Sequence, residues 1–146
     1  MPRRKAEYAQ LLELAEEHDR RLTLLADAAD QWLALGDLRR AATIYDGLTL
    51  LAPNDPTGFL GLAETYLAAG RHLAAAEQVL KAIHAWHCDR ITMARAYFLR
   101  FVALQAVGAH ADATRALKLM IKLDPDGLAR TLAQQSARPT ARGARS

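Results

Sequence analysis

The side chains of this 146-residue chain with the most obvious capacity for chemistry lie between residues 84 and 88. His84, His87 and Cys88 bring together two imidazoles and a thiol, which are ligands that zinc and other soft metals prefer. A structural zinc site needs four ligands, usually paired across the chain, and no other histidine lies nearby in sequence. We therefore interpret these three as solvated residues at the end of a helix and predict no metal. A metal-responsive protein remains the remote alternative.

No pattern of residues in the chain indicates an enzyme. A glycine-rich phosphate loop, a nucleophile elbow and a His-Glu-x-x-His zinc helix are all absent. Serine occurs only at Ser136 and Ser146, which makes a serine nucleophile implausible. The sequence therefore predicts a non-enzymatic protein with no catalytic residue and no cofactor.

The positive charge of the chain belongs to its two ends. The formal net charge is +3, but residues 1–5 carry three bases and residues 128–146 carry four, without acids. The remainder holds 12 bases and 16 acids, with its arginines scattered among the acids. Recognition of nucleic acid needs basic residues clustered on one face, so we expect no nucleic-acid partner.

The chain lacks the features of membrane and secreted proteins. No stretch approaches eighteen uninterrupted apolar residues, so we expect no membrane insertion. The first residues turn amphipathic where a secretory signal needs an apolar segment. The single Cys88 has no partner for an internal disulfide. These features predict a cytoplasmic protein.

The elements that must position any site are helical and repeat along the chain. Half of the chain is apolar, with many alanines and leucines, which favour helices. Gly36, Gly70 and Gly108 each end an Ala/Leu-rich segment, at spacings of 34 and 38 residues. A left-handed glycine at each site would end one helix and start a turn. Between the first two units, Asp55 is placed to cap the next helix and Pro56 to begin it.

A period of 34 residues is that of a helix–turn–helix unit, and the aligned residue types strongly resemble the tetratricopeptide repeat family. Small residues such as Ala41, Ala63 and Ala75 occupy positions where two helices approach closely. The resemblance implies an all-α solenoid with an amphipathic N-terminal helix, three repeats, and a short capping helix. We expect an N-terminal helix at 4–18 and repeats at 22–55, 56–89 and 94–127. Within the repeats we expect helices near 21–35, 38–51, 56–69 and 72–86 and two later helices that end near 107 and 123. A capping helix at 128–136 and a disordered basic tail at 137–146 should follow. Residues 88–93 are either a loop or an extra first turn of the following helix.

The resemblance also implies a concave groove lined by the first helix of each unit. Its matching positions form a mostly apolar strip with several acids and one base, suited to a protein or peptide client with apolar anchors. The candidate partner-binding residues are Asp27, Asp30, Leu33, Leu60, Glu64, Leu67, Arg95, Phe98, Leu99 and Val102.

One well-known use of such a groove is disfavoured by these residues. Family members that grip the C-terminal carboxylates of heat-shock chaperones use basic and amide side chains. The matching positions here are Ala26, Asp30, Gly61, Arg95 and Leu99, of which only Arg95 retains the expected chemistry. We therefore do not expect a carboxylate clamp.

A narrower resemblance is to class II chaperones of bacterial type III secretion and to related export co-chaperones. It rests on residues 59–63 and 69–76 of the second unit, within a likeness that covers roughly 22–127. It implies a chaperone or accessory protein that holds an apolar segment of a secreted translocator or apparatus subunit. It also implies a homodimer surface on the N-terminal helix at Tyr8, Leu11 and Leu12. The alternative is a general scaffold or regulator in another bacterial assembly.

Overall fold

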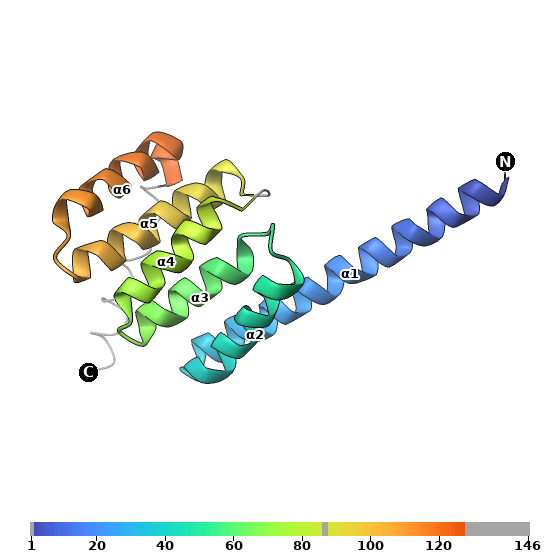
Figure 1. Cartoon of the computed structure of the whole chain (residues 1–146), viewed down its shortest axis with the longest axis horizontal. Coiled ribbons are helices and arrows are strands. Elements are labelled where there is room, and N and C mark those ends of the chain that lie inside the picture. The colour runs from blue at the N-terminus through green and yellow to red at the C-terminus, as the bar shows by residue number, and fades with distance from the viewer. Residues whose placement is uncertain (1, 86–87, 128–146) are drawn as a thin grey trace.

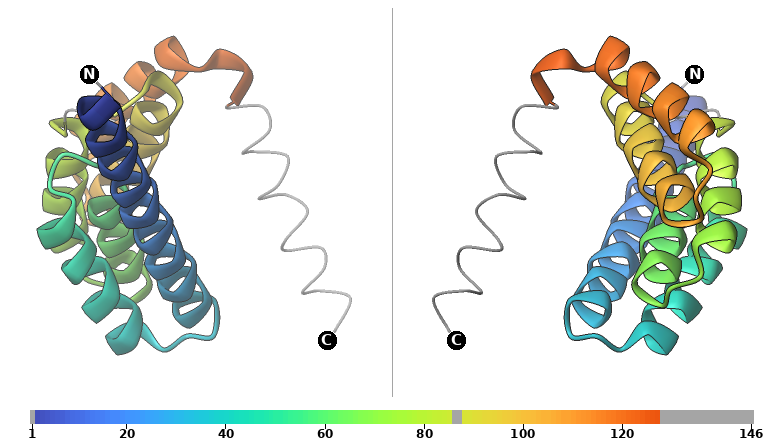
Figure 2. Two further views of the ribbon diagram at one scale, coloured as in Figure 1. Left: turned by 90° about the vertical axis from the view of Figure 1, so that its right-hand side faces the viewer. Right: turned by 90° about the vertical axis from the view of Figure 1, so that its left-hand side faces the viewer.

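The computed structural model describes residues 2–85 and 88–127. Among the described residues there are six α-helices, a further helical turn at 125–127 and no β-strand. The helices are α1 (Pro2–Ala34), α2 (Leu38–Leu51), α3 (Thr57–Ala68), α4 (His72–Ile83), α5 (Arg90–Ala106) and α6 (His110–Leu123). Each helix packs against the next one along the chain (Figure 1). Figure 2 shows α1 at one end of the stack and α6 at the other. The predicted all-α solenoid is confirmed.

The turns inside the three helix pairs have the same hydrogen bonding. Gly36, Gly70 and Gly108 have φ angles of 82°, 76° and 83°. In the second pair the Gly70 N–H donates to the Leu67 carbonyl at 3.1 Å, and the Arg71 N–H donates to the Tyr66 carbonyl at 2.8 Å. Equivalent bonds close the other two turns. This is the Schellman arrangement, which explains why glycine stands at each repeat boundary.

Small side chains fill the places where helices meet. Ala63 of α3, Ala75 and Ala82 of α4, and Ala96 and Ala103 of α5 have no exposed surface and share one core cluster. A second cluster joins α1, α2 and α3 around Tyr45. Alanine lets two helix backbones approach closely, and the three small residues singled out by the repeat pattern, Ala41, Ala63 and Ala75, are all fully buried.

The N-terminal part of the chain differs from the prediction. The sequence predicts a helix at 4–18 separate from one at 21–35, but α1 is a single helix of 33 residues. No glycine or proline lies between residues 3 and 34. An Arg21–Glu17 ion pair of 2.6 Å and a bond from the Thr23 hydroxyl to the Asp19 carbonyl cross the expected break. The polar residues around position 19 are simply an exposed turn of helix.

The four-residue insertion before the third unit is helical. The α5 helix has 17 residues against 12 in α3, and the Asp89 carboxylate caps it by accepting from the Thr92 N–H at 2.8 Å. Arg90 in the added turn donates to the Leu123 carbonyl at the end of α6. The choice between a loop and an extra turn at 88–93 is thereby resolved in favour of the turn.

Other helix ends lie within a few residues of their predicted positions. The α4 helix ends at Ile83 rather than near 86, and α3 begins at Thr57 rather than at 56. The predicted capping helix at 128–136 and basic tail at 137–146 lie outside the described residues. None of the described helices is long and apolar enough to cross a membrane.

Candidate functional site

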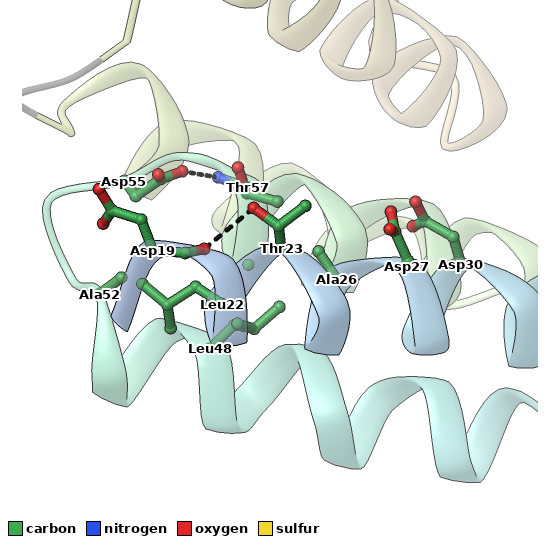
Figure 3. Close-up of a pocket in the computed structure, with 11 residues that line it drawn as sticks. Asp19, Leu22, Thr23, Ala26, Asp27, Asp30, Leu48, Ala52, Asp55 and Thr57 are labelled. Carbon is green, nitrogen blue, oxygen red and sulfur yellow. Dashed lines mark hydrogen bonds between the residues drawn. The ribbon is translucent and has the colours of Figure 1, made fainter. Parts of the chain in front are cut away.

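A pocket of about 520 Å³ opens between α1, the end of α2 and the start of α3 (Figure 3). Most of its lining comes from one side of α1, at spacings of three and four residues that place side chains on a shared face. The lining residues are Asp19, Leu22, Thr23, Ala26, Asp27, Asp30, Leu48, Ala52, Asp55, Thr57 and Gly58.

The pocket combines apolar side chains with four carboxylates. Its apolar members include Leu22 of α1 and Leu48 of α2, which both belong to the core cluster around Tyr45. The acidic members are Asp19, Asp27, Asp30 and Asp55. None of these four forms an ion pair within the part of the chain that the structure describes. The uncompensated negative charge favours a basic group of a partner.

Local structure explains how two of the carboxylates are held. Asp55 lies in the loop before α3 and accepts a hydrogen bond from the Thr57 N–H at 2.8 Å. It therefore plays the capping role that the sequence assigns to it. Asp30 accepts a hydrogen bond from the buried Tyr45 hydroxyl of α2.

Tyr45 joins three helices at the edge of this site. Its ring lies so close to α3 that a Cβ at Gly61 would overlap it. Burial raises the pKa of the Tyr45 phenol above its ordinary value, and the hydrogen bond to the Asp30 carboxylate raises it further. Tyr45 therefore stays neutral as a hydrogen-bond donor and fixes the position of the Asp30 side chain.

The structure brings only part of the predicted groove into this pocket. Asp27 and Asp30 line it. Glu64 of α3 forms an ion pair with Arg95 of α5, so these two groups satisfy one another. Arg95, the basic residue predicted for the groove, is thus already paired with Glu64, one of the acidic residues predicted for it.

The predicted apolar strip is partly buried in the core. Leu60 and Leu99 retain 3% and 8% of their exposure and belong to the cluster shared by α3, α4 and α5. They offer almost no surface to a client, because α3 packs between α2 and α4 and α5 packs between α4 and α6, so each helix buries more than one face. The other four apolar candidates are half-buried: Leu33, Leu67, Phe98 and Val102. The Phe98 ring lies 6.4 Å from that of Phe101.

The predicted self-association residues lie on α1 before the residues of that helix that line the pocket. The N-terminal part of α1 extends away from the other helices (Figure 1). Tyr8, Leu11 and Leu12 are all exposed. Leu14, which sequence reasoning did not single out, is exposed on the same segment.

The candidate metal ligands are not assembled by the described residues. His84 is exposed and Cys88 is half-buried, while His87 lies outside the described residues. Burial raises the pKa of the Cys88 thiol and nearby Asp89 adds to the shift, which favours the neutral thiol. Among the residues described, no three His, Cys, Asp or Glu side chains come together in a way that could hold a metal ion.

Sequence reasoning missed two carboxylates of the pocket as site residues. Asp19 falls where the sequence predicts a break between helices, and a continuous heptad pattern from Tyr8 to Trp32 would have placed it on α1. The sequence pattern identifies Asp55 only as a helix cap. Its position in the pocket lining depends on how the loop after α2 folds against α1. Only the three-dimensional packing shows that.

Comparisons with known proteins bear on the fold. No protein-family model matches the chain, and no curated protein matches it significantly. The first tetratricopeptide domain of Spaghetti (RPAP3), bound to the HSP90 peptide SRMEEVD, is similar with a TM-score of 0.67 and 18% identity, over 81% of this chain and 94% of that one. The Sgt2 tetratricopeptide domain from Aspergillus fumigatus is similar with a TM-score of 0.66 and 21% identity, over 86% of this chain and 83% of that one. The chain therefore has the fold of a tetratricopeptide repeat domain.

Proposed function

We propose that this chain is a protein-binding domain that receives an extended or helical segment of a partner at the pocket between α1, α2 and α3. The observation that carries the proposal is the pocket itself, which sets carboxylates that form no ion pair with the described residues beside apolar side chains. A partner with an apolar anchor next to lysine or arginine would match both parts of this lining.

The similar RPAP3 domain supports a peptide ligand but not one of the same chemistry. Its peptide, SRMEEVD, carries three acids and one base. The pocket here is acidic, and Arg95 is held by Glu64. An acidic peptide would therefore meet like charge at Asp27 and Asp30, where a basic one would meet opposite charge.

Asp27 provides a direct test, because it is exposed and forms no ion pair with the described residues. The probes are a leucine-containing peptide flanked by arginines, the same peptide with glutamates in place of the arginines, and SRMEEVD. We expect only the basic peptide to bind, and Asp27→Lys to weaken it by about two- to tenfold, as expected for an exposed ion pair that is reversed. Calorimetric titration at low and high salt measures this.

Asp46→Lys is the matched control, since Asp46 is an exposed aspartate of α2 outside the pocket. It should leave the affinity for the basic peptide unchanged. Equal loss in both variants, or binding of the acidic peptides as strong as that of the basic one, would reject the pocket as the binding site.

Within this function we propose a narrower role as a cytoplasmic chaperone or accessory protein of type III secretion. The support is the residue likeness of the second unit and the half-buried apolar side chains of α1, α3 and α5. Such a protein would also self-associate through Tyr8, Leu11 and Leu12, a surface separate from the pocket. Affinity capture from the native cell should recover a secreted apparatus subunit. Recovery of a folded partner from another assembly would favour the scaffold alternative instead.

A further inference from the structure

Another pocket of about 520 Å³, named here the arginine pocket, lies between α1 and α2 and shares no lining residue with the acidic pocket described above. All of its lining comes from the end of α1, the turn after it and the start of α2. The lining residues are Trp32, Asp37, Arg39, Arg40, Thr43 and Ile44. The arginine pocket therefore belongs to the first helix pair, and the proposed function makes no use of it.

The apolar part of the arginine pocket is held by the core. Trp32 and Ile44 both pack against the core cluster around Tyr45, and each is only half-buried, so each keeps some accessible surface. Side chains that the core already holds in place lose little freedom when a ligand arrives, which lowers the entropic cost of binding. The pocket thus offers a preformed apolar contact.

Arg40 is held beside this contact by two interactions. Its guanidinium carbon lies 4.5 Å from the centroid of the Trp32 ring, which is a cation–π contact, and its Nε lies 3.5 Å from the Asp37 carboxylate. Asp37 also caps α2 by accepting a hydrogen bond from the Arg40 backbone N–H at 3.1 Å. A guanidinium carries five N–H groups, and Asp37 is contacted by Nε, so Arg40 retains donors for an oxyanion.

Arg39 adds a second guanidinium to the same lining. It is exposed and forms no ion pair with the described residues. Because Arg40 compensates Asp37, the lining keeps one positive charge, whereas the acidic pocket is lined by four carboxylates and no base. The positions that match Arg39 and Arg40 hold no basic residue in the other two units, so the repeat fold itself does not require this pair.

We propose that the arginine pocket binds a phosphorylated serine or threonine of a protein partner. The phosphate lies between Arg39 and Arg40, and an apolar side chain next to the phosphorylated residue packs on Trp32 and Ile44. A phosphate monoester carries a charge of about −1.5 to −2 and three acceptor oxygens, which is enough to pair with both guanidinium groups at once. A carboxylate has a single charge and two oxygens, and one guanidinium satisfies it. A hollow between two helices admits single side chains, whereas a membrane presents its phosphates as a flat array, so a protein is the source that fits.

Fluorescence anisotropy with a labelled peptide that has one phosphoserine between two leucines tests the ligand. We expect the native chain to bind this peptide about tenfold or more tightly than the same peptide with serine or glutamate at that position, because only the phosphate engages both arginines. Equal binding of the three peptides overturns the proposal. Binding to phosphatidylserine vesicles without binding to the phosphopeptide also overturns it, in favour of a membrane ligand.

Charge reversal locates the site. Arg39→Glu should weaken the phosphopeptide by about tenfold or more, and Arg40→Lys should also weaken it, because lysine keeps the charge but loses the planar fork and the stack on Trp32. Arg71→Glu is the matched control: Arg71 also stacks on an aromatic ring, that of Tyr66 at 5.0 Å, but does not line the pocket. Equal loss in Arg39→Glu and Arg71→Glu would show that general charge holds the peptide, and overturns the proposal.

The two pockets give separate results, because they share no residue. Arg39→Glu should leave the binding of the basic peptide unchanged, and Asp27→Lys should leave the binding of the phosphopeptide unchanged. Loss of both peptides in Arg39→Glu would show that one surface binds both, and overturns a separate site. Circular dichroism checks that every variant keeps its helix content.

Discussion

At the scale of single residues, Tyr45 connects the core to the candidate site. It is buried on α2, donates a hydrogen bond from its hydroxyl to the Asp30 carboxylate of α1, and packs its ring on Gly61 of α3. One side chain thus fixes the relative positions of the three helices around the pocket.

Replacement of Tyr45 by phenylalanine should change how stability depends on pH. Because the folded pKa lies above the ordinary value of 10.0, the unfolded chain loses the phenolic proton first. The stabilisation from this group is fully present below about pH 10 and falls as the pH rises further. Tyr45→Phe should therefore show a shallower loss of unfolding free energy above pH 10, and about 1 kcal/mol less stability near neutrality from the lost hydrogen bond. Urea titrations at several pH values measure both, and identical alkaline slopes would contradict the argument.

At the scale of helices and turns, the Schellman glycines set where each helix pair reverses. Gly70 has a φ of 76°, which an L-residue with a side chain adopts only at a cost. Gly47, by contrast, lies inside α2 with no atom close to where a side chain would start. The same substitution therefore has opposite consequences at these two glycines.

We expect Gly70→Ala to lower the free energy of unfolding by about 1–2 kcal/mol, because alanine resists the left-handed conformation. Gly47→Ala should raise it by about 0.5–1 kcal/mol, because alanine favours helix over glycine. Thermal and chemical denaturation of the native chain and the two variants measure both changes in the free energy of unfolding. Stabilisation by Gly70→Ala would show that the turn does not need glycine.

The sequence predicts those features of the helices that depend on neighbouring residues, and it does not predict those that depend on packing between helices. Helix ends at Gly36, Gly70 and Gly108 depend on one residue and its neighbours, so the sequence pattern alone locates them. The continuity of α1 through Asp19 depends on the absence of a breaker, which a run of polar residues obscured. The burial of Leu60 and Leu99 depends on packing between helices, which a repeat position does not determine.

At the scale of the whole molecule, stability is distributed unevenly along the solenoid. The α3 helix packs against α1, α2, α4 and α5, whereas residues 3–21 of α1, named here the α1 overhang, are exposed throughout. In stacked repeats each unit is stabilised by its neighbours, so an inner helix is held better than an end.

Hydrogen exchange should reproduce this order. Backbone amides of α3 should exchange most slowly, and those of the α1 overhang should exchange fast in dilute protein, because none of the described helices packs on them. At high protein concentration the overhang amides should become protected while those of α3 stay unchanged. Slow exchange of the overhang in dilute protein would show that this helix is stable without a neighbour.

The unbroken course of α1 has a mechanical consequence. Its exposed N-terminal segment and the wall that carries Asp19, Asp27 and Asp30 are parts of one rod, since no glycine or proline interrupts residues 3–34. The hydrogen bond from the Tyr45 hydroxyl to Asp30 and the packing of Leu22 in the core around Tyr45 hold one end of this rod in place. The same contacts that position the carboxylates of the pocket therefore also set the direction in which the exposed segment points.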